Sequence, residues 1–348
     1  MTITFLDFLN NLISMPNFLI VTLLISGVMF VNGCTDAPNS VATCISTRCL
    51  SPNKALALSV IFNFLGILIM TFVNATVAQT IFNIVDFGTN THNALIALCA
   101  ALISIVLWSI MAWTLGLPTS ESHALIAGLT GSAIALQHGI SGINFEEWKK
   151  VIYGLIIINV LGFLSGMFIT KLIEKICKNK DRRKTDKFFH KLQIVGAAAM
   201  GFMHGAQDGQ KFMGVFLIGA MLATGNQDGF DIPIWLTVYC AIFMGLGAVI
   251  GGRKIIKTVG MKMVKMEKYQ GASADVASTL CLFGSSLVGI PLSTTHVKTT
   301  AIMGVGASKG MSRVNWNVAK NMVLTWIFTF PGCGLLGYIS TLIFMKIF

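Results

Sequence analysis

The chain has 348 residues, of which 54% are hydrophobic and only 11% are charged, and its mean hydropathy is +0.76. Soluble domains carry about 25% charged residues, so this composition excludes an ordinary soluble domain and indicates a protein that lies in a lipid bilayer. The net charge of +11 comes from Lys and Arg gathered in a few segments between apolar runs, which is typical of membrane topology. We therefore expect no nucleic-acid partner.

Long apolar runs follow one another along the chain, and a helix needs about 20 apolar residues to cross a bilayer. They lie at 17–33, 55–85, 93–117, 151–172, 232–252 and 321–347. With shorter and interrupted elements added, we expect an all-α polytopic membrane protein with roughly 10–12 membrane elements. The N-terminal segment MTITFLDFLN has an acidic residue, Asp7, and no basic one, so we expect no cleaved secretory signal.

The eight cysteines are scattered through apolar segments and form no CxxC pair. Free cysteine commonly behaves as a small buried apolar residue. We therefore expect no cysteine-based metal centre and no organic cofactor.

A first motif occurs twice. VNGCTDAPNSVATC (31–44) aligns with MHGAQDGQKFMGVF (203–216), which places Asp36 on Asp208, 172 positions later. In the first copy Gly33 and Pro38 interrupt an apolar run, and proline removes a backbone donor and breaks helical continuity. The second copy has Gly205 and Gly209 instead, and we expect a break in the helix there too.

A second motif also occurs twice. LPTSESHALIAGLTGSAIA (117–135) aligns with IPLSTTHVKTTAIMGVGAS (290–308) at an offset of 173. The alignment places Pro118 on Pro291, Ser120 on Ser293 and His123 on His296. Two unrelated motif pairs with one spacing, close to half the chain length, indicate an internal duplication.

The basic residues predict that the two copies have opposite orientations. The segment 48–54 holds Arg48 and Lys54, whereas its counterpart 222–231 has no Lys or Arg. The segment 76–93 has none, whereas its counterpart 253–268 has six: Arg253, Lys254, Lys257, Lys262, Lys265 and Lys268. Since basic loops stay on the cytoplasmic side, equivalent loops lie on opposite sides of the membrane, as in inverted-topology repeats.

These patterns divide the chain into three parts. We expect a first inverted repeat at 1–170, a basic cytoplasmic linker at 171–191 and a second inverted repeat at 192–348. The linker is read as an ordinary solvated loop. The whole protein would be a multi-pass protein of the cell membrane.

Asp36 and Asp208 are the most informative residues. An ionisable side chain at membrane depth costs at least about 2.5–3.5 kcal/mol, so it marks an ion path or a paired site. Interrupted helices expose carbonyl oxygens, and these together with a carboxylate suit Na⁺; a proton carrier is the alternative. A hydrogen-bonded structural aspartate is the other interpretation, and two equivalent aspartates make it weaker.

The second motif predicts two re-entrant helical hairpins whose tips are helix N-termini. Unpaired N–H groups and the positive end of the helix dipole favour an oxyanion. Hydroxyl groups would add donors, and two tips would hold a tetrahedral anion from opposite sides. The hydroxyl residues are Ser120, Ser122, Ser293, Thr294 and Thr295. The alternative is that they only cap their helices.

Four further polar residues have less certain roles. His123 and His296 end their motifs and are as compatible with a structural as with a functional role. Lys211 follows Asp208 by three positions and would either pair with it or reach the anion. Asp275 lies in an apolar stretch, where a coupling or gating role is plausible.

At these motifs the sequence resembles the inorganic phosphate transporter (PiT) family over essentially the whole chain. That family has a paired GAND-type and a paired PxSxxH-type signature, matched most closely by HGAQDGQKFMGV and PLSTTHVKTTAIMGVGASKG. The resemblance implies symport of inorganic phosphate with Na⁺ or H⁺ through an elevator-like or rocking core. It also implies that the ion and anion sites are lined by Asp36, Asn39, Asp208, Ser120, Ser122, Ser293, Thr294 and Thr295.

The sequence departs from the family pattern near these sites. Thr35 and Gln207 replace the asparagine that precedes each aspartate, and Glu121 replaces a hydroxyl residue. Asn63 and Asp275 stand where the family has glutamates. Glu121 would either repel phosphate or take up the proton or cation that neutralises it.

We therefore predict a secondary active transporter that imports inorganic phosphate with Na⁺ or H⁺, not an enzyme. The predicted phosphate-binding residues are Ser120, Ser122, Ser293, Thr294, Thr295, Gln207 and Lys211. The predicted cation-binding residues are Asp36, Asn39, Thr35, Asp208 and Glu121, with Na⁺ at Asp36 and Asp208. The predicted coupling or gating residues are Asp275, His123 and His296.

Two alternatives remain at this stage. One is a permease for sulfate or another small oxyanion on the same scaffold. The remote one is an intramembrane aspartyl protease, which needs two carboxyl groups that share a proton at close contact. The expected partners are phosphate, the coupling cation, the lipid bilayer and, in a homo-oligomer, further copies of the chain.

Overall fold

The computed structural model describes residues 3–115, 119–225, 230–251 and 263–348. In this part of the chain all regular elements are helices, and the one β-type contact is an isolated bridge between Val85 and Ile143. Seven of the described helices are long and apolar enough to cross a membrane. They are α2 (Pro16–Thr35), α4 (Pro52–Val73), α6 (Thr91–Leu115), α8 (Phe145–Cys177), α11 (Ile234–Gly251), α13 (Lys268–Val288) and α15 (Trp316–Ile347). The prediction of an all-α polytopic membrane protein is confirmed.

The outer surfaces of these helices are apolar. Large exposed side chains lie on α2, α4, α6, α8 and α11, among them Leu23, Phe72, Leu107, Phe168 and Ile250. Over their most apolar 18 residues, the spans that contain α2 and α6 are mostly buried, whereas only a minority of the residues in those of α8 and α15 are buried. A surface of this kind matches the hydrocarbon of a bilayer.

The apolar run 55–85 does not form one helix. α4 ends at Val73, and α5 (Thr76–Phe82) begins after a short break. Asn74 makes the break, because its backbone is extended and its side chain accepts a hydrogen bond from the main-chain N–H of Thr76 at 2.9 Å. Asparagine competes in this way with the helical backbone, which hydropathy does not register.

The first aspartate motif interrupts its helix. α2 ends at Thr35, a 3-10 helix, η1 (Ala37–Val41), follows, and a short α3 (Ala42–Ser46) completes the segment. Pro38 lies in the first turn of η1, where a missing backbone N–H is tolerated. The segment is buried throughout its length.

The second aspartate motif was expected to break its helix, and this prediction is wrong. α9 (Arg182–His204) continues into α10 (Gln210–Thr224) through a π-helical stretch, η3 (Gly205–Gly209). A π-helical turn shifts the hydrogen-bond register without ending the helix. The stretch carries Asp208 on a continuous helical backbone.

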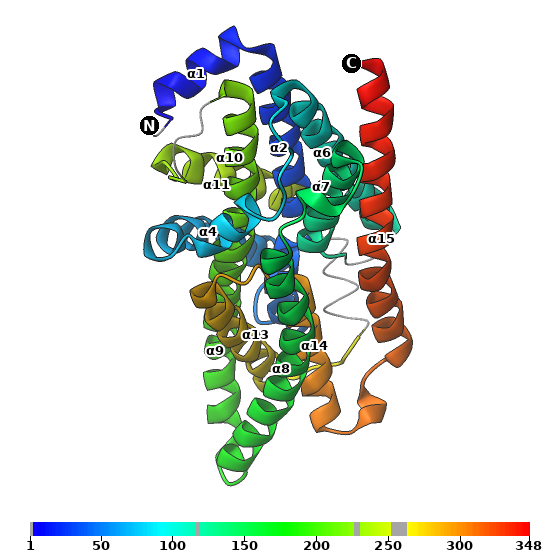
Figure 1. Cartoon of the computed structure of the whole chain (residues 1–348). Coiled ribbons are helices and arrows are strands. Elements are labelled where there is room, and N and C mark those ends of the chain that lie inside the picture. Colours follow the sequence, from blue (N-terminus) through cyan, green and yellow to red (C-terminus); the bar gives the residue numbers. More distant parts are fainter. Residues whose placement is uncertain (1–2, 116–118, 226–229, 252–262) are drawn as a thin grey trace.

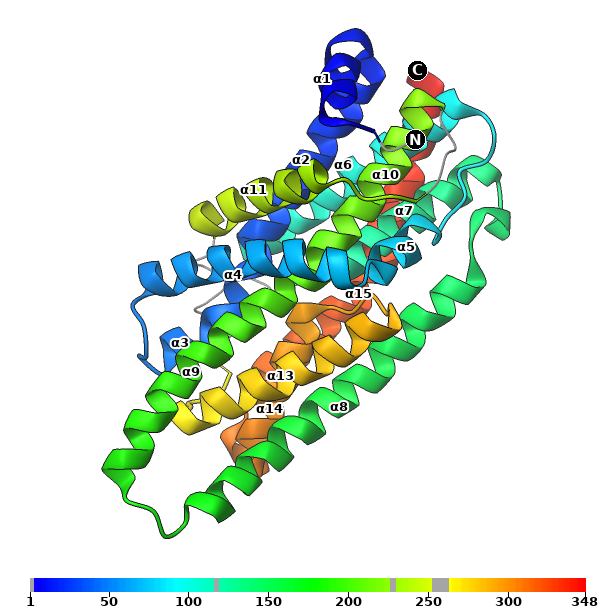
Figure 2. The ribbon, with the colours of Figure 1, turned by 90° about the vertical axis from the view of Figure 1, so that its left-hand side faces the viewer.

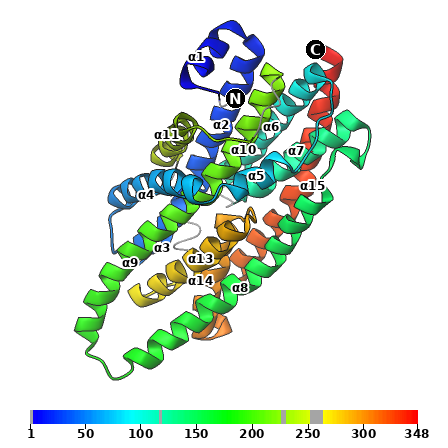
Figure 3. The ribbon, with the colours of Figure 1, turned by 60° about the vertical axis from the view of Figure 1, so that its left-hand side comes forward.

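Two shorter helices fill the interior, α7 (Glu121–Gln137) and α14 (Thr294–Ser308). α7 packs against α15 and α14 packs against α8, so each lies beside a helix distant in sequence (Figure 1). Glycine permits this close approach: a side chain on Gly131 would overlap the backbone of Gly334, and one on Gly304 would overlap that of Phe163. Other helices from the two halves of the sequence also pack against each other: α2 packs against α11, and α4 packs against α9. α4 and α11 lie side by side (Figures 2 and 3).

The basic segment 171–191 was expected to be a solvated loop, and this prediction is wrong. α8 continues to Cys177 and α9 begins at Arg182, so only a short turn joins them. Asp181 starts α9, because its carboxylate accepts a hydrogen bond from the N–H of Arg183 at 2.7 Å. This turn lies at the end of the molecule opposite both termini, and we call it the linker end (Figures 1 and 2).

Candidate functional site

The N-termini of α7 and α14 lie in the buried interior. The hydroxyl of Ser120 caps α7 by accepting a hydrogen bond from the N–H of His123 at 3.2 Å. The hydroxyl of Ser293 caps α14 in the same way, from His296 at 3.3 Å. Both serine oxygens therefore act as caps, while their hydroxyl hydrogens stay available to a ligand. Pro118, which opens the first of these motifs, lies outside the described residues.

Asp36 lies directly beside the N-terminus of α14. Its Oδ1 accepts a hydrogen bond from the Thr295 hydroxyl at 2.7 Å, and the amide of Asn39 donates to the same hydroxyl at 2.8 Å. The other carboxylate oxygen of Asp36 and the amide oxygen of Asn39 are buried, and neither has a hydrogen-bond partner among the described residues. Buried oxygens of this kind are unfavourable unless a donor or a cation satisfies them, so their arrangement suits a bound cation.

Asp208 is surrounded by donors. Its Oδ1 lies 2.6 Å from the ammonium of Lys211, and its Oδ2 lies 3.2 Å from Nδ1 of His204 and 3.3 Å from the amide nitrogen of Asn32. All four side chains are buried. The two acids therefore differ, because Asp208 has a side-chain cation beside it and Asp36 has no ion-pair partner among the described residues.

The first turn of α14 joins the two aspartates. The Thr294 hydroxyl donates to Asp208 at 3.4 Å, and the next residue, Thr295, donates to Asp36. The two aspartate motifs and the second tip motif thus meet at one place. This cluster of Asp36, Asp208, Thr294 and Thr295 is the centre of the candidate site.

The first tip motif reaches the same centre through Lys211. The ammonium of Lys211 donates to the Ser122 hydroxyl at 2.6 Å and to the main-chain carbonyl of Leu292. Ser122 lies in the first turn of α7, and Leu292 lies just before α14. Lys211 therefore pairs with Asp208 and links both helix N-termini.

Glu121 is buried at the start of α7. Its two carboxylate oxygens accept hydrogen bonds from Ser109 at 2.6 Å and from Thr35 at 3.0 Å. Thr35 immediately precedes Asp36, so Glu121 is tied to the first aspartate motif. No Lys or Arg contacts Glu121 within the described segments.

Gln207 braces the segment that leads into α14. Its amide nitrogen donates to Ser285 at 3.0 Å and Ser286 at 2.8 Å, and its amide oxygen accepts from the N–H of Leu292 at 3.1 Å. These bonds fix the backbone just before the Ser293 cap. The residue thus contacts the predicted anion site through the protein backbone.

His123 and His296 form an aromatic group with their neighbours. Their ring centroids are 4.4 Å apart; His123 stacks on Phe330, and His296 stacks on Trp326. Both ring nitrogens of His296 are buried and have no hydrogen-bond partner in residues 3–115, 119–225, 230–251 and 263–348. The pair joins α7 to α14 one turn into each helix.

Asp275 belongs to a separate cluster. It forms an ion pair with Lys298 and accepts hydrogen bonds from Thr43 at 2.7 Å and from Gln193, and Asp275 and Lys298 are fully inaccessible. Lys298 was not singled out by the motif analysis. A lysine three positions after Thr295 inside a stretch of small and apolar residues is itself a signal of a buried acidic partner.

Asn32 and His204 were also missed. His204 precedes Asp208 by four positions on one helix face and contacts it, whereas Asn32 precedes Asp36 by four positions but contacts Asp208 of the other motif. The signal in the sequence that could have identified these two residues is a polar side chain within an apolar run, four positions before an aspartate.

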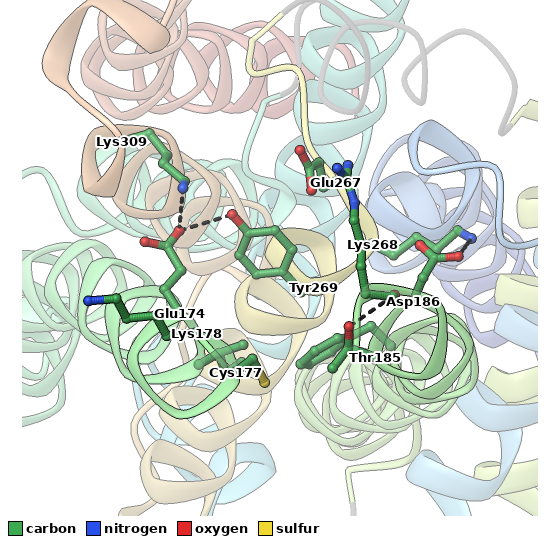
Figure 4. Close-up of a pocket in the computed structure, with 12 residues that line it drawn as sticks. Glu174, Cys177, Lys178, Thr185, Asp186, Glu267, Lys268, Tyr269 and Lys309 are labelled. Atoms are coloured by element: carbon green, nitrogen blue, oxygen red, sulfur yellow. Dashed lines mark hydrogen bonds and ion pairs between the residues drawn. The ribbon is translucent and has the colours of Figure 1, made fainter. Parts of the chain in front are cut away.

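A pocket of about 310 Å³ opens at the linker end, away from this centre. Figure 4 shows its lining from α8, α9, α13 and the end of α14. Lys309 pairs with Glu174 at 3.0 Å, which ties the end of α14 to α8, and Lys268 pairs with Asp186 at 2.6 Å, which ties α13 to α9. Tyr269 donates a further hydrogen bond to Glu174 at 2.9 Å.

The chemistry of the centre favours hard ions. The atoms that could bind a cation there are carboxylate, amide, hydroxyl and carbonyl oxygens, which suit Na⁺ and not a transition metal. Within the described ranges no three His, Cys, Asp or Glu side chains gather as a metal site. The helix N-termini with their hydroxyl groups suit an oxyanion.

A bundle of apolar helices around buried acids and helix N-termini defines a membrane protein of the transporter class. A model of the phosphate transporter family matches residues 32–337. A probable low-affinity inorganic phosphate transporter of Bacillus subtilis (strain 168) is 39% identical over 319 residues, which cover 92% of this chain and 94% of that protein. One of Rhizobium meliloti (strain 1021) is 35% identical over 311 residues, 88% of this chain and 90% of that protein.

A solved structure named "The sodium-dependent phosphate transporter" has the same fold, with a TM-score of 0.86, 22% identity, and coverage of 96% of this chain and 100% of that one. The chain belongs to the phosphate transporter family. The resemblance stated from the motifs is confirmed, and membership of a family of transporters excludes the aspartyl protease alternative.

Proposed function

We propose that this chain imports inorganic phosphate across the cell membrane by symport with Na⁺ or H⁺. The observation that carries the proposal is the contact of one helix N-terminus with both aspartates, through Thr294 and Thr295. An anion at this N-terminus and a cation at the carboxylates would lie within one turn of each other. Each would therefore raise the affinity of the other by the same factor.

The anion is bound by the two tips. The first turn of α7 and the residue just before Ser293 meet at Lys211, and each helix N-terminus offers main-chain N–H groups, hydroxyls and the positive end of its dipole. Ser120 and Ser293 offer their hydroxyls, whereas Ser122, Thr294 and Thr295 offer main-chain N–H groups, because their hydroxyls already donate to Leu292, Asp208 and Asp36. Gln207 fixes the backbone and Lys211 adds charge.

The cation binds between Asp36, Asn39 and Thr295, where buried oxygens lack partners. Thr35 and Glu121 form the outer part of this position and add a second negative charge. Asp208 completes the charge balance on the other side of α14. The Na⁺-dependent protein of the same fold favours Na⁺, while the buried acid Glu121 leaves H⁺ as the alternative.

The two halves, 1–170 and 192–348, act as inverted repeats that rearrange around the site. Matching packing of α7 on α15 and of α14 on α8 supports the duplication, and the distribution of Lys and Arg supports the inversion. The linker end then faces the cytoplasm. Arg253, Lys254, Lys257 and Lys262, on which part of this inference depends, lie outside the described residues.

Uptake into proteoliposomes tests the proposal. Labelled phosphate is offered with an inward Na⁺ gradient at equal pH, or with an inward pH gradient in the absence of Na⁺. Concentrative uptake under one gradient identifies the cation, and the absence of concentrative uptake under both would contradict symport. A tenfold excess of sulfate should leave uptake unchanged; competition by sulfate would favour the oxyanion permease.

A further inference from the structure

One contact of the site occurs twice, with different chemistry. The amide of Asn39 donates to the Thr295 hydroxyl at 2.8 Å, and the ammonium of Lys211 donates to the Ser122 hydroxyl at 2.6 Å. Asn39 and Lys211 are 172 positions apart, and Ser122 and Thr295 are 173 apart, which are the offsets of the two motif pairs. The two contacts are therefore equivalent, but one is neutral and the other carries a positive charge.

The surroundings of Lys211 resemble those of a bound alkali cation. Its ammonium touches a carboxylate oxygen of Asp208, the hydroxyl of Ser122 and the carbonyl of Leu292. An ammonium has three N–H groups, and all of them are used here. Carboxylate, hydroxyl and main-chain carbonyl oxygens are also the ligands that Na⁺ takes at interrupted helices.

Within the described ranges, no Lys or Arg occupies the equivalent position beside Asp36. Its carboxylate and the Thr295 hydroxyl correspond to Asp208 and Ser122, and Thr119 corresponds to Leu292. Asn39 is too short and carries no charge, and in the part of the chain that the structure describes its amide oxygen and one oxygen of Asp36 are buried without partners. Acceptors are thus present where the other half has a fixed cation.

We propose that Lys211 is a tethered cation that permanently fills one of two equivalent cation positions, so that only the position at Asp36 takes up a mobile coupling cation. This inference rests on the cation symport proposed above. The fixed charge helps to balance the anion without being transported. The number of cations that move through these two positions per phosphate is therefore one and not two.

Lys211→Asn tests this, because it gives the second position the residue found in the first. The probe is the cation that drives the parent: Na⁺ if the Na⁺ gradient drives uptake, H⁺ if the pH gradient does. We expect the charge moved per phosphate, read from the reversal potential, to rise by one and the dependence of uptake on cation concentration to become steeper. Uptake with unchanged charge per phosphate would overturn the proposal.

If the Lys211→Asn variant does not transport phosphate, the binding of the cation to the purified protein is measured directly. The number of cations bound per purified protein is measured at saturation with ²²Na⁺, or by proton titration for an H⁺-coupled parent. Lys211→Asn should bind one more than the parent, and an equal number would overturn the proposal. For a Na⁺-coupled parent, Lys211→Met is the matched control: it removes the charge but fills the space, so the number of Na⁺ bound should equal that of the parent, and a gain of Na⁺ there would also overturn the proposal.

Failure of the symport itself gives a different result. A parent protein driven by neither gradient contradicts the proposed function before any variant is compared. A parent that is driven, with a Lys211→Asn variant that binds no further cation, contradicts only the role given to Lys211.

Discussion

The hydroxyl of Thr295 donates a hydrogen bond of 2.7 Å to the carboxylate of Asp36, 259 positions earlier in the chain. The bond joins the interrupted helix of the first motif to the helix N-terminus of the second. The other oxygen of Asp36 is buried and receives no hydrogen bond from any described residue. One side chain thus belongs to the cation position while it is held by the element that binds the anion.

Asp36→Asn should abolish concentrative phosphate uptake. The amide keeps an acceptor for Thr295 but removes the charge that would hold the coupling cation. The variant should be purified in the parent's amount and with an unchanged melting temperature, because the hydrogen bond persists. Uptake in proteoliposomes is the measurement, with Thr295→Ser, which keeps the hydroxyl, as a control that transports. Full uptake by Asp36→Asn would remove this residue from the cation site.

Substitutions of Ser293 can distinguish its role as a helix cap from its proposed role in anion binding. Loss of an N-cap costs about 0.5–2 kcal/mol of stability, so an alanine variant would confuse the two roles. Ser293→Asp keeps a good cap but puts a negative charge where the anion binds, so we expect a stable protein with at least tenfold weaker phosphate uptake. Ser293→Asn keeps the cap without the charge and should transport. Equal uptake by the Asp and Asn variants would show that this N-terminus does not bind phosphate.

The sequence predicts the helices well where apolar residues continue on every face, as along α6 and α8, because the bilayer requires such runs. It fails at Asn74, where one side chain satisfies the next N–H and ends α4. It fails again at Gly205–Gly209, because a π-helical turn and a broken helix have the same hydropathy. Both errors depend on hydrogen bonds and not on composition.

The candidate site, like the helices, could be predicted from the sequence only in part. The repeated motifs identify Asp36, Asp208 and the two helix tips. They do not predict that Thr294 donates a hydrogen bond to Asp208 while Thr295 donates one to Asp36. That pairing depends on how α14 packs against the first half of the chain. Lys298 was overlooked because its counterpart, Leu125, is apolar, and a search by repetition cannot find a residue that occurs once.

Glu121→Gln tests the second negative charge near the anion. The Ser109 and Thr35 hydroxyls donate to this carboxylate, and an amide can keep one of these bonds while losing the charge. With the coupling cation at saturating concentration, we expect the KM for phosphate to fall severalfold, because repulsion of the anion is removed. The dependence on the coupling cation should weaken in the same variant. An unchanged KM with an unchanged cation dependence would place Glu121 outside the transport site.

The buried pair of Asp275 and Lys298 gives a prediction about stability. Removing one partner of a buried ion pair costs about 3–5 kcal/mol, because the other charge stays unpaired, whereas replacing both by apolar residues is often neutral or stabilising. The chain itself contains the apolar version: the positions 173 residues earlier are Leu102 and Leu125, both in the hydrophobic core. We therefore expect Lys298→Leu to lower the melting temperature sharply.

The double variant Asp275→Leu with Lys298→Leu should recover the parent's melting temperature or exceed it. Thermal unfolding in detergent gives the three values needed for the comparison. If the double variant is as stable as the parent, the pair is not needed for folding, and any accompanying loss of phosphate uptake assigns it to transport. If the double variant is as unstable as Lys298→Leu, the pair is required for stability, because Thr43 and Gln193 then remain buried with unsatisfied groups that the leucines cannot compensate.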